Sequence, residues 1–196
     1  LIFSIAMYER VKSWVRHEGG RLMYLGGNGL NCAVEFVDTN RVIYRNGDAR
    51  ALRSRGLESR MHLTHESEAN LLGVVFDERG IMTSAPYRVI DGSSWVFSGT
   101  GLRTGETFGH HSVHRRCPGG ASGHETDKIS PSSPQGTLLL ARGLNLGDGG
   151  AEMVLVPSPS GGWVFAVGSI TYPSALLVDE GVSRLTANVL SRFLEP

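Results

Sequence analysis

The first clear alternation of apolar and polar residues covers residues 7–17. Charged residues separate apolar side chains that recur at helical spacing. The apolar residues are Met7, Val11, Trp14 and Val15. This is the 3.6-residue period of an amphipathic helix. Gly19-Gly20 follows, as is common just past a helix end. The pattern predicts a helix over residues 7–17.

A short apolar run, residues 21–25, follows this helix and ends at Gly26-Gly27-Asn28-Gly29. A continuous apolar run is typical of a strand that is buried on both faces, as in parallel sheets. Helix, turn, apolar strand and glycine-rich turn together form the αβ unit of such a sheet. We therefore predict that residues 22–25 form a central strand flanked by helices. Ligands gather at the carboxyl ends of such strands, so the 26–29 turn is the expected place for a site.

The remaining pattern predicts several strands and two further helices. The predicted strands are residues 32–37, 41–45, 95–97, 138–141, 153–156 and 164–167, and the last two are joined by a hairpin at residues 157–162. A short helix is predicted within residues 66–72. A terminal helix is predicted over residues 182–194, with these residues on one face: Val182, Leu185, Val189, Leu190 and Phe193. We expect it to pack on the sheet through Leu185, Val189 and Phe193.

These elements predict one α/β domain over residues 1–196. Residues 46–135 are rich in turns, and we expect them to form an elaboration over the sheet. The chain lacks an initiator Met, and its first apolar residues lack the basic flank and cleavage site of a signal peptide. We therefore expect it to be the C-terminal part of a longer polypeptide.

Composition excludes some classes of partner. Lys plus Arg and Asp plus Glu number 19 each, so the basic excess usual in nucleic-acid binders is absent. The sequence contains no apolar run of the ~18 residues that suggest a membrane span. Two cysteines, Cys32 and Cys117, are too few for a disulfide framework, which favours a cytoplasmic location. We predict no nucleic-acid or membrane partner.

Histidines are concentrated in one segment. Four of the seven lie within fifteen residues, with Cys117 among them: His110, His111, His114 and His124. Imidazole, carboxylate and thiolate groups are common transition-metal ligands. No defined zinc motif is matched, so a polar surface loop that is rich in histidine is the alternative.

A run of small residues, Gly119-Gly120-Ala121-Ser122-Gly123, precedes His124 and Glu125. Such a run lets the backbone turn sharply and approach other segments closely. Glu125 is therefore a candidate metal ligand or general base. The alternative is that Glu125 and Asp127 are acids at the start of a helix, where they complement its dipole.

Four segments, in the same order, resemble the large subunit of N,N-dimethylformamidase. They are residues 21–29, Gly99-Thr100-Gly101-Leu102, residues 119–127 and residues 164–170, and the ending at residues 182–190 is similar too. The resemblance implies a three-layer, flavodoxin-like sandwich similar to class I glutamine amidotransferases. It also implies amide hydrolysis at an iron ion held by two tyrosines and one glutamate.

By position, Glu125 matches that glutamate and His124 is its neighbour. One tyrosine is expected just after the 26–29 turn, where this chain has Asn31, and the other just before the first helix, where residues 1–6 contain none. We predict an amide (C–N) hydrolase-like domain that acts on a small molecule. In this prediction Glu125 and His124 are catalytic, and Asn28, Gly29 and Asn31 line the crevice. The alternative is a non-catalytic binding or scaffold domain, and assembly as a homo-oligomer is left open.

Overall fold

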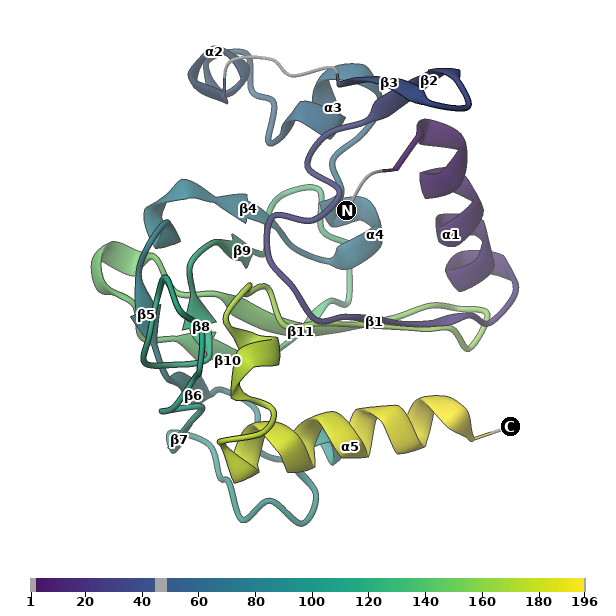
Figure 1. Cartoon of the computed structure of the whole chain (residues 1–196). Coiled ribbons are helices and arrows are strands. Elements are labelled where there is room, and N and C mark those ends of the chain that lie inside the picture. The colour runs from purple at the N-terminus through teal and green to yellow at the C-terminus, as the bar shows by residue number, and fades with distance from the viewer. Residues whose placement is uncertain (1–2, 45–48, 196) are drawn as a thin grey trace.

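The computed structural model describes residues 3–44 and 49–195, and a six-stranded sheet lies at its centre (Figure 1). The strands follow the order β1-β12-β11-β10-β6-β7. Their bounds are β1 (Arg21–Tyr24), β12 (Trp163–Ala166), β11 (Glu152–Pro157), β10 (Leu138–Gly143), β6 (Tyr87–Val89) and β7 (Thr107–Phe108). β1 runs parallel to β12, and each other neighbouring pair in this sheet is antiparallel. The predicted α/β class is confirmed.

Helices cover both faces of this sheet. Figure 1 shows α1 (Ile5–His17) on one side and α5 (Glu180–Leu194) on the other. Three short helices lie on the side of α1: α2 (Ala49–Ser54), α3 (Arg60–Thr64) and α4 (Ala69–Leu72). Four 3-10 turns complete the helical elements: η1 (Glu78–Gly80), η2 (Trp95–Phe97), η3 (Leu146–Asp148) and η4 (Tyr172–Ala175).

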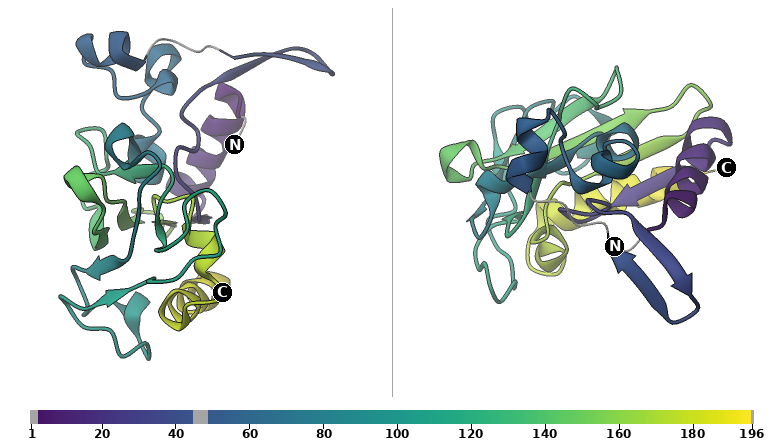
Figure 2. Two further views of the ribbon diagram at one scale, coloured as in Figure 1. Left: turned by 60° about the vertical axis from the view of Figure 1, so that its left-hand side comes forward. Right: turned by 90° about the horizontal axis from the view of Figure 1, so that it is seen from above.

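Three two-stranded ladders supplement the main sheet. The hairpin of β2 (Val34–Asp38) and β3 (Arg41–Tyr44) projects from the molecule, as Figure 2 shows. β4 (Val75–Asp77) pairs with β9 (Thr126–Lys128), and β5 (Ser84–Ala85) pairs with β8 (Ser122–Gly123). The last two ladders bring the glycine-rich segment 119–128 against residues 75–85.

Each face of the sheet has its own apolar core. Val182, Leu185 and Val189 of α5 are fully buried against one face. Tyr8 and Val15 of α1 are buried against the other. Consecutive residues of β1 serve opposite cores, because side chains alternate along a strand. Leu22 packs into the α1 core and Met23 into the α5 core, which explains the continuous apolar run.

Both terminal helices form as predicted, although their buried faces differ in detail. Ser4 caps α1 by accepting a hydrogen bond from the Met7 amide, and Asp179 caps α5 by accepting one from the Val182 amide. Met7 and Trp14 are 42% and 39% exposed, so Tyr8 takes the buried position that we assigned to Met7. Leu190, which the pattern placed on the same helical face as Leu185, is 49% exposed.

The prediction that residues 22–25 form a central strand is wrong, since β1 lies at one edge of the six-stranded sheet. The largely parallel sheet is wrong as well. The short turn between β11 and β12 allows only antiparallel pairing, because a parallel connection needs a dozen or more residues. The structure shows helices on both sides of a mixed sheet. The more specific flavodoxin-like arrangement stays a prediction.

The turn-rich segment at residues 46–135 contributes strands to the main sheet, whereas we expected it to lie over the sheet. Its strands β6 and β7 extend the main sheet beyond β10. The predicted strand at residues 95–97 is the 3-10 turn η2, and the helix predicted within 66–72 is restricted to α4. Among residues 3–44 and 49–195, no helix combines the length and the apolar character that crossing a bilayer requires.

Candidate functional site

The 26–29 turn follows the carboxyl end of β1 and is held there by two buried side chains. Asp127 accepts hydrogen bonds from the Asn28 amide at 2.7 Å and from the Tyr24 hydroxyl at 3.2 Å. The same hydroxyl accepts one from the Gly29 amide at 2.6 Å. Burial, together with the nearby Asp127 carboxylate, raises the pKa of Tyr24 far above its usual value, so this phenol keeps its proton. The turn is thus fixed at the amides of Asn28 and Gly29.

Glu125 approaches this turn from the β8–β9 segment. A Cβ atom on Gly27 would stand 2.5 Å from the Glu125 carbonyl oxygen, so only glycine permits this approach. The Glu125 carboxylate accepts a hydrogen bond from the Asn28 side-chain amide at 3.1 Å. Glu125 lies just before β9 and Asp127 lies within it, so the alternative that they start a helix is wrong. The structure therefore brings Asn28 and Glu125 together, both of them predicted site residues.

Backbone strain is concentrated here. Asn28, Leu30 and His124 have φ angles of 52°, 59° and 63°, a left-handed region that side chains other than glycine adopt at a cost. Strain of this kind persists only where the surrounding structure enforces it, and it is frequent at binding and catalytic sites. The two segments that meet at Glu125 thus both carry strained residues.

Unpaired buried polar atoms mark the same place. Within the described part of the chain, three buried side-chain polar atoms lack a hydrogen-bond partner: Asn28 Oδ1, His124 Nδ1 and Glu68 Oε1. Most buried polar atoms in proteins are paired, so each exception requires an explanation. Two of these three belong to predicted site residues, and a ligand that supplies polar partners would satisfy them.

The four clustered histidines do not form one site. The rings of His114 and His124 meet edge to face, with centroids 5.0 Å apart. His114 Nδ1 accepts a hydrogen bond from the Cys117 amide, and burial is the main cause that lowers the pKa of His114. His110 instead contacts Thr107, and His111 is exposed. The four histidines therefore do not converge on one candidate metal site.

The other predicted crevice residue, Asn31, has a structural task. Its carbonyl accepts a hydrogen bond from the Met61 amide at 2.6 Å, and its side-chain oxygen accepts one from the Arg60 amide at 3.4 Å. Both contacts fix the start of α3. Gly29 is held in the turn by the hydrogen bond from its amide to the Tyr24 hydroxyl.

One group of potential metal ligands converges among the described residues: Glu9, His65 and Glu66, whose ligand atoms lie within 4.8 Å of one another. It is remote in sequence from the predicted site. Glu66 already accepts hydrogen bonds from Tyr8 and Lys12, which compensates its charge. This arrangement is explained as a link between α1 and the segment that precedes α4.

Sequence reasoning missed Tyr24, Asp127 and Glu68. Tyr24 was taken as part of an apolar strand and Asp127 as a helix-start acid. Glu68 is 1% exposed, and its carboxylate accepts a hydrogen bond from Ser59. Burial raises the pKa of Asp127 to about 7 and that of Glu68 to about 8. The sequence offered no signal for these two acids, because Glu68 and Asp127 both stand in polar stretches that are typical of an exposed segment.

From the raised pKa values of Asp127 and Glu68 we predict that the protein is more stable at pH 5.5 than at pH 8. Their pKa values are raised in the folded state, so between about pH 4 and pH 8 the folded chain binds more protons than the unfolded one. Stability therefore falls as pH rises through that window. The lowered pKa of His114 opposes this trend only below about pH 6.5, and the ion-paired Asp77 matters only below about pH 4.

Thermal unfolding followed by circular dichroism between pH 5 and pH 8 measures this trend. Glu68→Gln should reduce the slope, because glutamine cannot titrate and can still accept the Ser59 hydrogen bond. A melting temperature that rises steadily from pH 5.5 to pH 8 would contradict the prediction.

A family model described as N,N-dimethylformamidase beta subunit-like, C-terminal, matches residues 3–184. The match covers the 26–29 turn, the glycine-rich run and the start of α5. No curated protein matches this chain.

Proposed function

This chain belongs to the N,N-dimethylformamidase beta subunit-like, C-terminal family, and on that premise we propose that it carries an amide (C–N) hydrolase-like site at Asn28, His124 and Glu125. The observation that supports this proposal is the meeting of the two strained segments at the Asn28–Glu125 hydrogen bond. The unpaired polar atoms Asn28 Oδ1 and His124 Nδ1 add to it, because a polar ligand would give them partners.

In the proposed reaction Glu125 acts as the general base. It accepts a proton from a water molecule while the water oxygen attacks the amide carbonyl carbon. The C–N bond then breaks, and the proton passes to the leaving nitrogen, which gives a carboxylic acid and an amine. Asn28 orients the Glu125 carboxylate through its side-chain amide, and its unpaired oxygen accepts a hydrogen bond from the substrate. His124, whose Nδ1 has no hydrogen-bond partner, orients the substrate.

The iron ion that the family resemblance implies does not enter these steps. Tyr24 is engaged with Asp127 and Gly29, and Asn31, which stands where the resemblance expects a tyrosine, holds α3. The side chains that surround Glu125 therefore do not fit an iron held by two tyrosines and one glutamate. An iron ion at Glu125 stays a prediction, and metal analysis of the purified protein tests it directly.

Glu125→Gln is expected to reduce amide hydrolysis by about 100-fold or more, the usual contribution of a general base. N,N-dimethylformamide is the probe, and release of dimethylamine followed by NMR is the measurement. Stability should change little, because glutamine keeps the hydrogen bond with Asn28 after a flip of its amide. Glu180→Gln, at an exposed glutamate in the first turn of α5, is the matched control and should keep full activity.

The second candidate function is a binding or scaffold domain without chemistry. Asn31 favours it, because this residue replaces an expected ligand and is used to hold α3. This alternative predicts that the wild-type chain binds small amides and releases no amine. The word subunit in the family's description favours an assembly of chains, so both assays should be run on the oligomer found in solution.

A further inference from the structure

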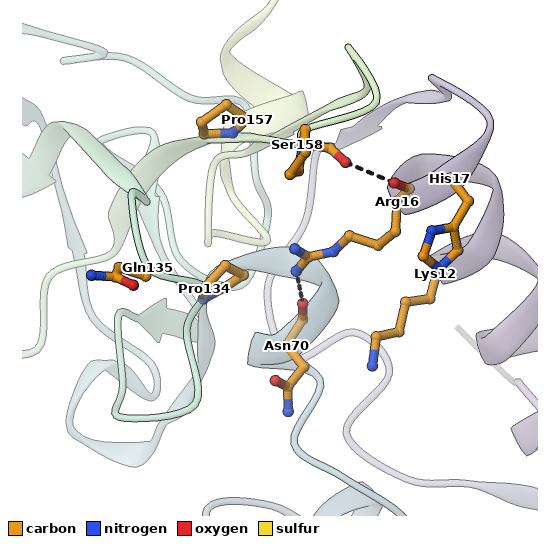
Figure 3. Close-up of a pocket in the computed structure, with 9 residues that line it drawn as sticks. Lys12, Arg16, His17, Asn70, Pro134, Gln135, Pro157 and Ser158 are labelled. Carbon is orange, nitrogen blue, oxygen red and sulfur yellow. Dashed lines mark hydrogen bonds between the residues drawn. The ribbon is translucent and has the colours of Figure 1, made fainter.

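A basic groove lies at the opposite end of β1 from the proposed site. It is bordered by the C-terminal half of α1, by α4 and by the turn that joins β11 to β12, and its volume is about 990 Å³ (Figure 3). Three of its lining residues are basic and come from α1: Lys12, Arg16 and His17. None of the nine lining residues is acidic, although the whole chain has a formal charge of zero. The lining side chains that carry charge at pH 7, Lys12 and Arg16, are therefore all positive.

Arg16 is the central feature of this groove. Figure 3 shows its side chain reaching from α1 toward α4, where the guanidinium donates a hydrogen bond to the Asn70 carbonyl. Arg16 is half-buried, and within residues 3–44 and 49–195 it forms no ion pair with a carboxylate. A guanidinium has five N–H donors, so one carbonyl leaves most of them unused. A partly desolvated cation without a counter-ion is costly, and a bound anion would remove that cost.

The groove around Arg16 is held by specific contacts. Ser158 donates a hydrogen bond to the Arg16 carbonyl at 3.1 Å, and Ser160 donates one to the Val15 carbonyl at 3.1 Å. These two bonds anchor the β11–β12 turn to the last turn of α1. Lys12 lies beside Arg16 and forms an ion pair with Glu66. The Glu66 carboxylate therefore neutralises the charge of Lys12 and leaves that of Arg16. The basic face is thus preorganised, which reduces the cost of binding.

The walls of the groove are apolar. Pro134 lies on one side of Arg16, and Pro157 and Pro159 lie along the β11–β12 turn. Proline rings present flat hydrocarbon surfaces and lose no side-chain entropy on contact. A ligand that joins an anionic head to an apolar body would match both features. Its carboxylate or phosphate group would meet the Arg16 fork, which suits both geometries.

We propose that this groove is a binding site for small organic anions, in which Arg16 holds the carboxylate or phosphate head and the three prolines contact the apolar body. The site is separate from the 26–29 turn and does not depend on the proposed hydrolase function. It uses the arginine fork, the neighbouring lysine and the proline walls together.

The test uses three probes that share one ring: benzoate, phenyl phosphate and neutral benzyl alcohol. Each is titrated into the ¹⁵N-labelled chain, and NMR shifts of the amides of Arg16, Asn70 and Ser158 are followed. Both anions should bind and benzyl alcohol should not, and the ratio of the two anion affinities identifies the preferred head group. Equal shifts with benzyl alcohol, or no shifts with either anion, would overturn the proposal.

Arg16→Gln should weaken binding of both anions by about tenfold or more, the usual effect of losing a charge-assisted hydrogen bond. Arg10→Gln is the matched control, since Arg10 lies on the same helix and pairs with Glu18 outside the groove. Arg16→Lys keeps the charge and loses the fork, so it should bind both anions with intermediate affinity. It replaces Arg16→Gln in the test if that variant loses stability. Unchanged affinity in both Arg16 variants would sink the assignment.

Discussion

Deletion of residues 182–196 should abolish the cooperative unfolding transition of this protein. These residues form most of α5, and Val182, Leu185 and Val189 are fully buried against the sheet. Each side chain of this size stabilises the fold by ~1.5–3 kcal/mol when it is fully buried. Their combined loss approaches the whole unfolding free energy of an ordinary domain, about 5–15 kcal/mol. Deletion also exposes the apolar face of β10, β11 and β12 to water.

A pair of point variants separates this effect from a general sensitivity of the helix. Leu185→Ala should lower the unfolding free energy by ~2–5 kcal/mol, because it leaves a cavity in a closed core. Leu190→Ala changes the same side chain on the same helix, and the exposed position should limit its effect to about 0.5 kcal/mol. Denaturant unfolding measures both. A truncated chain that still melts cooperatively, or equal effects of the two variants, would show that α5 is not part of the core.

Local features of the fold could be predicted because they depend on neighbours in sequence. The two terminal helices were found from their 3.6-residue period, and the strands β2 and β3 and the β11–β12 hairpin from apolar runs around turn residues. The error at Met7 has the same origin. A helical period identifies an apolar stripe but not its edges, and Tyr8 is buried because its hydroxyl reaches Glu66 across 58 residues.

Strand order could not be predicted, because it depends on contacts between distant segments. The apolar run in β1 indicated a strand covered on both faces, which is observed, but coverage does not distinguish a central strand from an edge strand. Nor did any local pattern indicate that β6 and β7 extend the main sheet. Both strands are short, and they lie within a segment dominated by turns.

The candidate site was accessible from sequence in part. Small residues at 119–123 suggested a close backbone approach, and Gly120 and Gly123 do pack closely, but against the backbone of residues 83–86. The close approach to Glu125 is made by Gly27 of the turn. The supporting residues were not accessible, because Tyr24 and Asp127 act only once the two segments meet. The clustering of histidines in the sequence was misleading. His110 and His114 are close in the chain, yet their side chains lie in different surroundings.

Gly27→Ala should lower the unfolding free energy by ~1–3 kcal/mol and remove ligand binding at the proposed site. The new Cβ would stand 2.5 Å from the Glu125 carbonyl oxygen and 3.2 Å from the Ile170 amide nitrogen. Both atoms are backbone, so neither can rotate away, and overpacking of this kind forces the segments apart. The Glu125 side chain moves with its backbone, so the Asn28–Glu125 hydrogen bond should break when the turn and the Glu125 segment move apart.

Gly26→Ala is the control that isolates this contact. It lies in the same turn, and its Cβ would meet only the Tyr24 ring, at 3.5 Å or more, which is ordinary van der Waals distance. Neither glycine has a φ angle in the left-handed region, so backbone strain does not distinguish them. Gly26→Ala should therefore leave stability unchanged or raise it slightly, through the lower entropy of the unfolded chain. If Gly27→Ala proves as stable as Gly26→Ala and still binds amides, the Glu125 segment does not pack on the turn. The site must then be sought elsewhere on the sheet.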